Sequence, residues 1–214
     1  MRKLNRVAAG LVAAVAAMAT SSAMLVPAEA APAAQGNRSL AKVLAADGTR
    51  FDRNWGDFDV TEAAVLAVLK AKPDSAVSLL TKGRQRATVF VPTDAAFRNL
   101  VHDLTGKRPH TEKAAFKAVA GLGIDTVETV LLYHVVPGAT LNSQKVVAAA
   151  KADTRIQTAA GIGFKVDLRR GEVVIVDRDY NDNNARAIAE LLDINAGNKQ
   201  IAHGITKVLR PADL

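Results

Sequence analysis

The sequence has no cysteine among its 214 residues, and aromatic residues make up only 4% of it. Without cysteine the chain can form no disulfide, perform no thiol chemistry and accept no thioether-linked lipid. Its fold must therefore be stabilised by a core, and it is not a lipoprotein. No basic run is interleaved with aromatic residues, as stacking on nucleic acid requires, so nucleic acid is not an expected partner.

The signatures of the common catalytic classes are also missing. There is no G-x-S-x-G nucleophile motif, and "GKRPH" (106–110) lacks the rest of a phosphate-binding loop. His102 and His110 stand eight residues apart, which is not the i, i+4 spacing that places two metal ligands on one helix face. We therefore predict that the chain is not an enzyme. A hydrolase with paired carboxylates stays an alternative, because such carboxylates approach one another in space rather than in sequence.

The N-terminus has the three parts of a secretory signal peptide. Arg2, Lys3 and Arg6 precede an apolar, alanine-rich stretch, and Ala28-Glu29-Ala30 forms an A-x-A cleavage site. We predict a signal peptide over 1–30, a short disordered lead-in over 31–38 and one domain over 39–214. The alternative is a retained anchor, because 7–26 is just long enough to span a bilayer. An exported protein without cysteine favours a bacterial source.

The charge is moderately positive, with 28 basic and 21 acidic residues. Removal of the predicted signal peptide would leave a smaller excess of basic residues, scattered over pairs such as Arg84/Arg86 and Lys107/Arg108. Such an excess favours contact with polyanions, for example anionic wall polymers or acidic glycans. The alternative interpretation is an ordinary soluble surface.

The period of the apolar residues changes along the chain. Helical patterns cover "SLAKVLAAD" with Ser39 as cap, "VTEAAVLAVLKA", "DSAVSLLTKG", "DAAFRNLVHDL", "TEKAAFKAVAGLG", "DTVETVLLYHV" and "NSQKVVAAAKA". "ATVFV" reads as a short buried strand, and after about residue 154 the strands "RIQTA", "FKVDL" and "EVVIVD" follow, the last two joined by a hairpin. Helices in the first half and strands in the second predict the α+β class.

One loop has the ligand spacing of a calcium site. In "DYNDNNARAIAE" (179–190), Asp179, Asn181, Asn183 and Glu190 occupy loop positions 1, 3, 5 and 12. Arg186 stands where an apolar residue is usual, and no flanking helix pair is evident. We prefer the alternative, an Asx-rich turn whose side chains bond their own backbone, and predict no metal and no cofactor.

Three stretches together resemble a fasciclin domain. They are "ATVFVPTDAAF" (87–97), "LLYHVVPG" (131–138) and "NKQIAHGITKVLRP" (198–211), in the order of that family's pattern. The last stretch departs from the pattern at Lys199, usually glycine, and at Thr206, usually aspartate. The resemblance covers nearly the whole mature chain.

The resemblance implies a fold and a type of function. The implied fold is a wedge in which a β-sandwich-like set of strands packs with several helices. The implied function is a secreted, non-enzymatic module for cell adhesion or extracellular interaction, whose partner would be an extracellular protein, glycan or polyanionic surface. In animal members the tyrosine-histidine segment is associated with receptor binding, which corresponds here to Tyr133 and His134.

The residues themselves suggest a structural role for His134. It lies in the most apolar setting of the four histidines, and a buried imidazole needs a hydrogen-bond partner. If the segment is helical up to Pro137, Leu131 and His134 share a face. We expect a hydrogen bond from His134 to the "PTD" turn through Thr93 or Asp94. Thr93 and Asp94 also suit the start of the following helix, and His203 is expected to play a similar structural role in the last strand.

The function therefore has two main interpretations. The first is an adhesion or interaction module in the extracellular space, attached to the cell surface non-covalently if at all, since no span follows the leader. The second is a soluble carrier or sensor that binds a glycan, lipid or small molecule in a cleft. A distinct apolar pocket with converging polar groups would favour the carrier.

Overall fold

The computed structural model describes residues 35–46, 48 and 50–212. The predicted signal peptide (1–30) and the alternative anchor (7–26) lie outside the described residues. Among the residues that are described, no helix is both long enough and apolar enough to cross a membrane.

The centre of the fold is a three-stranded sheet. Strand β1 (Ala87–Pro92) lies in the middle, antiparallel to β2 (Val135–Pro137) and parallel to β7 (Gln200–Ile205). Every residue of β1 is buried, because both faces of the sheet are covered. Val89 and Val91 contribute to one core and Phe90 to the other, as the two-residue period of a strand requires.

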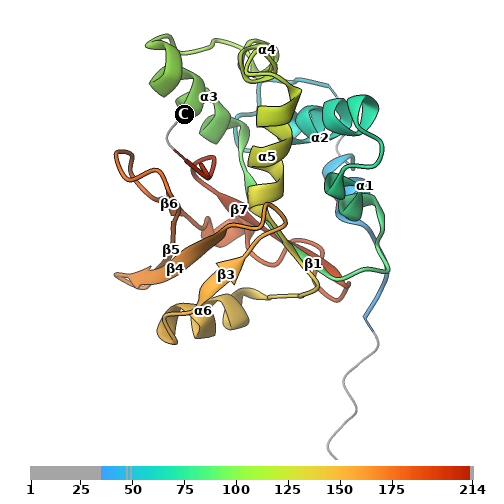
Figure 1. The fold of residues 1–214 in the computed structure, drawn as a ribbon, viewed down its shortest axis with the longest axis vertical. Helices are drawn as coiled ribbons and strands as arrows, with labels where there is room; N and C mark the ends of the chain where they lie inside the picture. Colours follow the sequence, from blue (N-terminus) through green and yellow to red (C-terminus); the bar gives the residue numbers. More distant parts are fainter. Residues whose placement is uncertain (1–34, 47, 49, 213–214) are drawn as a thin grey trace, which may run out of the picture. The chain divides into compact units, whose positions relative to one another are not determined.

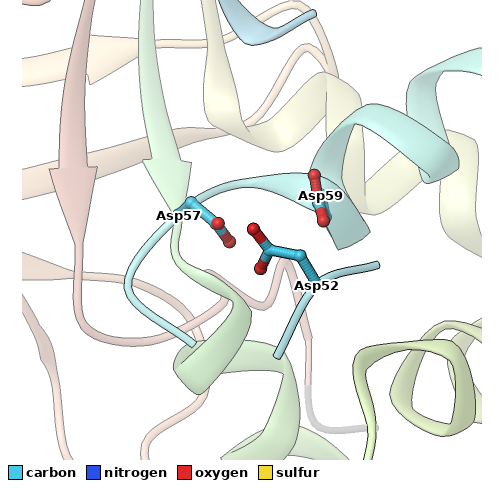
Figure 2. Close-up of side chains that lie close together, drawn as sticks. All are labelled: Asp52, Asp57 and Asp59. Atoms are coloured by element: carbon cyan, nitrogen blue, oxygen red, sulfur yellow. The ribbon is translucent and has the colours of Figure 1, made fainter. Parts of the chain in front are cut away.

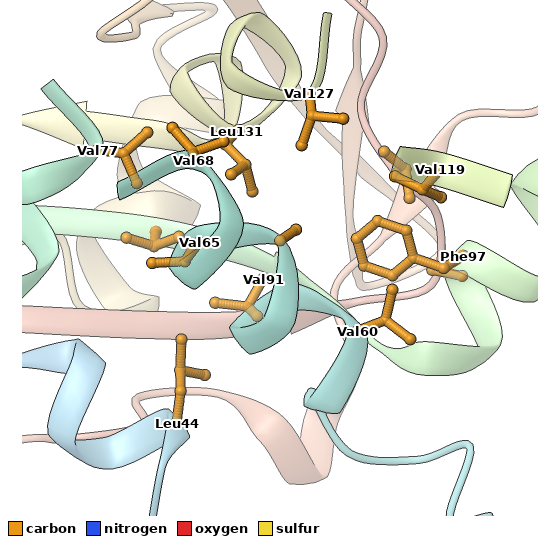
Figure 3. Close-up of a cluster of buried hydrophobic side chains, with 14 of the residues drawn as sticks. Leu44, Val60, Val65, Val68, Val77, Val91, Phe97, Val119, Val127 and Leu131 are labelled. Carbon is orange, nitrogen blue, oxygen red and sulfur yellow. The ribbon is translucent and has the colours of Figure 1, made fainter. Parts of the chain in front are cut away.

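Helices cover the first face of this sheet (Figure 1). They are α1 (Leu40–Leu44), α2 (Asp59–Ala71), α3 (Asp94–Thr105), α4 (Glu112–Ala120) and α5 (Ile124–His134), with the 3₁₀ helix η1 (Ala76–Thr81). Local chemistry sets several of their ends. The Ser39 hydroxyl accepts a hydrogen bond from the Lys42 amide, and Gly106 ends α3 with a left-handed backbone. Valines and leucines from these helices form the first core with Phe97 (Figure 3).

The second face packs against a four-stranded antiparallel sheet. Its strands are β3 (Arg155–Gln157), β4 (Gly163–Arg169), β5 (Glu172–Val176) and β6 (Ala185–Arg186), in that spatial order. The β4–β5 hairpin turns at Arg170 and Gly171, whose φ values of 55° and 86° are those of a type I′ turn. Helix α6 (Ser143–Lys151) covers β4, and the 3₁₀ helix η2 (Ala189–Leu191) precedes β7.

The α+β class is confirmed, with helices mainly early and strands mainly late in the chain. Two local expectations differ from the structure. Residues 76–81 form a 3₁₀ helix, and α5 ends at His134, because Val135–Pro137 pair with β1. In the described part of the predicted lead-in, Gly36 exchanges backbone hydrogen bonds with Gly197 and Lys199.

Candidate binding site

The two residues with the best-motivated binding role are buried. Tyr133 and His134 are the last residues of α5, and their exposed fractions are 0% and 2%. Consecutive helical residues point about 100° apart, so the two side chains enter different parts of the interior. Neither side chain can touch a partner at the surface while the domain stays folded.

His134 joins α5 to the end of the chain. Its Nε2 accepts a hydrogen bond from the Leu209 amide at 2.9 Å, so the ring proton is on Nδ1, which lies 2.7 Å from the Val130 carbonyl oxygen. The expected partner was therefore wrong: both ring nitrogens are occupied by backbone groups, and neither Thr93 nor Asp94 is among them. Burial lowers the pKa of His134 to about 4, against the smaller effect of the Val130 hydrogen bond, so the imidazole is neutral.

Tyr133 belongs to an aromatic cluster between the two sheets. Its ring meets Phe164 edge to face at 5.9 Å, and Phe164 meets Phe90 in the same way at 5.1 Å. The tyrosine hydroxyl has no hydrogen-bond partner among the described residues, and burial raises its pKa to about 12. Tyr133 is thus a core aromatic whose polar atom is unsatisfied.

Thr93 and Asp94 lie at the junction between β1 and α3. Thr93 is the N-cap residue of α3, but its hydroxyl makes no capping hydrogen bond. Asp94 is the first residue of α3, and its Oδ1 accepts a hydrogen bond from the Val60 amide at the start of α2. Burial raises the pKa of Asp94 to about 8, and the neighbouring carboxylates of Asp57, Glu112 and Asp59 add to the effect.

His203, in β7, also bonds to backbone groups. Its Nδ1 accepts from the Asp193 amide at 3.2 Å, so the proton is on Nε2, 2.8 Å from the Leu141 carbonyl oxygen. Its ring packs 5.6 Å from that of Phe90. Burial lowers the pKa of His203. It connects β7 to the segment before α6 and to the segment that follows η2.

The accessible part of the 131–138 segment is its end. Pro137 and Gly138 are exposed and line an open groove of about 710 Å³ together with residues of η1 and of the segment between η1 and β1. Lys82 and Arg86 provide positive charge along this groove, and Asp74 provides one negative charge. We call this surface the η1 groove. Sequence reasoning singled out the segment but not the face that it presents.

An enclosed apolar cavity lies beside His134. It is lined by residues such as Leu40, Val65 and Leu131, and its volume is only about 20 Å³. That volume suits about one water molecule, and drug-sized ligands need several hundred Å³. The cavity therefore gives no support to the carrier interpretation.

The loop with calcium-site spacing is placed next to basic side chains. Asp179 is buried, and its Oδ2 pairs with the Arg210 guanidinium at 2.6 Å. Glu190 is exposed in η2, beyond strand β6. A strand and a 3₁₀ turn flank the loop, not the helix pair of a calcium-binding hand. A cation near Asp179 would have to compete with Arg210.

The hydrolase alternative needs carboxylates in an open cleft. Asp94 does have a raised pKa and acidic neighbours, but it is completely buried beneath the start of α3. A glycan cannot reach its carboxyl group without separation of the packed helices.

Comparison with known proteins agrees with this fold. None of the curated proteins matches the chain. A FAS1 domain pair from the insect cell adhesion molecule fasciclin I aligns with a TM-score of 0.52 at 17% identity, over 72% of this chain. The alignment covers 47% of that protein, so the present chain spans about half its length. The family model of the fasciclin domain matches residues 63–211, and the chain therefore belongs to the fasciclin domain family.

Proposed function

We propose that the protein is a secreted interaction module that binds an acidic extracellular partner through the η1 groove, and that cell adhesion is its biological role. Fasciclin domains are in general extracellular adhesion modules, and the insect protein of similar fold is a cell adhesion molecule. The observation that carries the proposal is the open groove at the exposed end of the 131–138 segment. Open, shallow surfaces suit macromolecular partners better than small ligands.

Charge favours an acidic partner. Without residues 1–30, which hold three basic residues and one acidic residue, the formal charge of +7 falls to +5, and Lys82 and Arg86 lie exposed along the groove. Anionic wall polymers and acidic glycans carry repeated charges that such a surface attracts over a Debye length of about 10 Å at 0.1 M salt.

Charge reversal at the groove tests this proposal. The double variant Lys82→Glu/Arg86→Glu should lose at least about tenfold in affinity for an immobilised acidic polysaccharide such as heparin at low salt. The matched control is Lys107→Glu/Arg108→Glu, because it changes the net charge equally at an exposed loop away from the groove. Equal losses in the two variants would show that only net charge matters. Failure of the unaltered protein to bind any anionic polymer would contradict the acidic partner.

Export is a separate part of the proposal. The leader-like residues 1–30 support secretion with cleavage after Ala30, in a bacterial host. Mass spectrometry of protein from the culture medium should find Ala31 as the new N-terminus. Recovery of the intact chain in the membrane fraction would favour the anchor instead.

A further inference from the structure

Three helices begin at one point in the first core, and each begins with an acidic residue. Asp59, Asp94 and Glu112 are the first residues of α2, α3 and α4. One carboxylate oxygen of each lies within 4.8 Å of those of the other two. All three are buried, and Asp94 and Glu112 are 0% and 1% exposed. Three buried carboxylates this close repel one another unless something compensates their charge.

Backbone amides satisfy only one oxygen of each of the two most buried acids. The Val60 amide donates to Asp94 Oδ1 at 3.0 Å, and the Arg53 amide donates to Glu112 Oε2 at 3.0 Å. Asp94 Oδ2 and Glu112 Oε1 are inaccessible to solvent and have no hydrogen-bond partner among the described residues. Buried oxygens are rarely left without a partner, so these two indicate a ligand that the protein atoms do not supply.

The helix ends cannot neutralise the cluster. Each helix N-terminus is equivalent to about half a positive charge, which is half of what each ionised carboxylate would need. The helix ends therefore compensate the charge of the ionised acids only in part.

A second acidic group connects this cluster to solvent. Asp52, Asp57 and Asp59 also lie with ligand oxygens within 4.8 Å of one another, so Asp59 belongs to both groups. Figure 2 shows the carboxylates of Asp52 and Asp57 directed toward each other beside the start of α2. Asp52 is exposed and Asp57 is half-buried, and a separate open groove of about 510 Å³ reaches Glu112. A small ion can thus approach from the surface.

We propose that Asp59, Asp94 and Glu112 bind a hard divalent cation, Ca²⁺ in the first instance, and that Asp52 and Asp57 supply further oxygens from the solvent side. Carboxylate oxygens are the ligands that Ca²⁺ prefers, and Ca²⁺ accepts six to eight of them in irregular geometry, whereas Mg²⁺ requires a regular octahedron. The groove near Glu112 is also lined by Arg50, Arg53 and Lys113, which weaken the attraction. The site is independent of the acidic partner proposed above.

Thermal unfolding of the purified protein in EDTA, in 10 mM CaCl₂ and in 10 mM MgCl₂ tests the site. Extracellular calcium modules bind with dissociation constants of about 0.1–1 mM, which predicts that CaCl₂ raises Tm by about 3–8 °C over EDTA. Equilibrium dialysis against radioactive Ca²⁺ should give one ion per chain.

Two conservative variants locate the ion. Asp94→Asn keeps the acceptor for the Val60 amide, and Glu112→Gln keeps the acceptor for the Arg53 amide, so either one suffices if the other does not fold. Each should lose at least about tenfold in Ca²⁺ affinity, since each removes a ligand charge. Glu190→Gln is the matched control, because Glu190 is exposed and belongs to the loop with calcium-site spacing.

The expected result is a calcium-dependent Tm in the unaltered protein and in Glu190→Gln, with little or no rise in the other two variants. Three results would overturn the proposal. The first is an unaltered protein that neither gains stability nor retains Ca²⁺. The second is a rise of the same size in Asp94→Asn and Glu112→Gln. The third is a rise that only Glu190→Gln abolishes, which would place the ion in the 179–190 loop.

Discussion

Replacement of His134 by alanine should destabilise the domain by about 3 kcal/mol. The substitution leaves the Leu209 amide without its acceptor, and Leu209 is completely buried. An unsatisfied buried donor costs about 1–3 kcal/mol, and the void left by the imidazole adds a cavity cost of comparable size. Urea unfolding followed by circular dichroism measures the change as a lower midpoint at constant slope.

Two further variants separate the hydrogen bond from the packing. Glutamine can present its side-chain oxygen to the Leu209 amide, so His134→Gln should be more stable than His134→Ala by about 1 kcal/mol. His110→Ala, at an exposed loop position, should stay within about 0.5 kcal/mol of the unaltered protein. A His134→Ala protein as stable as His110→Ala would refute the structural role of His134.

The pH dependence gives a second, independent check on His134. Its pKa in the folded protein is about 4, below the ordinary value of 6.5, so the unfolded chain takes up the proton first. The contribution of the neutral His134 to the free energy of unfolding is complete above pH 6.5. It is lost as pH falls toward 4, by about 3 kcal/mol in all. The cost of His134→Gln should therefore shrink between pH 7 and pH 4.5. A cost that does not change with pH would show that the imidazole is accessible to protons in the folded state.

Three other substitutions test neighbouring parts of the structure. Tyr133→Phe removes a hydroxyl that has no partner, so the free energy of unfolding in urea should stay unchanged or rise by about 1 kcal/mol; a loss above 1 kcal/mol would reveal a hidden partner. The free energy of unfolding of Asp94→Asn, measured in EDTA, should rise by at least about 1 kcal/mol relative to that of the unaltered protein between pH 4 and pH 8. The reason is that the raised pKa of Asp94 makes its ionisation oppose folding in that range, and parallel pH profiles of the two proteins would contradict this. Arg210→Met leaves the buried Asp179 unpaired and should lower the free energy of unfolding by about 3–5 kcal/mol. Adding Asp179→Asn should restore much of this loss, and losses that simply add in the double variant would show that the two residues are not coupled.

The sequence was sufficient for features that depend on near neighbours. The apolar period and the cap at Ser39 locate α1, and α2 follows from the helical pattern of 60–71. The β4–β5 hairpin follows from Gly171 between two strand patterns, because glycine readily accepts the positive φ that this turn position requires. These features arise within a few residues of chain, where spacing determines which side chains meet.

Contacts between distant segments were not predictable in the same way. The partner of His134 is Leu209, 75 residues further along the chain, and it uses a backbone amide that no sequence motif can mark. Each of Asp59, Asp94 and Glu112 has the local pattern of an ordinary acidic helix start, which is common because it suits the helix dipole. Only the packing of α2, α3 and α4 brings the three together.

The three segments of the family pattern turn out to be neighbours in space. Residues 87–97, 131–138 and 198–211 contain β1, β2 and β7, the three strands of the central sheet. His134 adds a hydrogen bond from the second segment to the third. The residues of the pattern are therefore those that form the central sheet, and any domain with this fold needs them.

It follows that the pattern identifies the fold more directly than the partner. Tyr133 and His134 are buried in the interior of the domain, so their replacement alters binding only through the folded state. On the function proposed above, partner choice depends on side chains outside the pattern, such as Lys82 and Arg86 of the η1 groove. A binding defect in a His134 variant is therefore informative only at a temperature and pH where unfolding experiments show that variant to be fully folded.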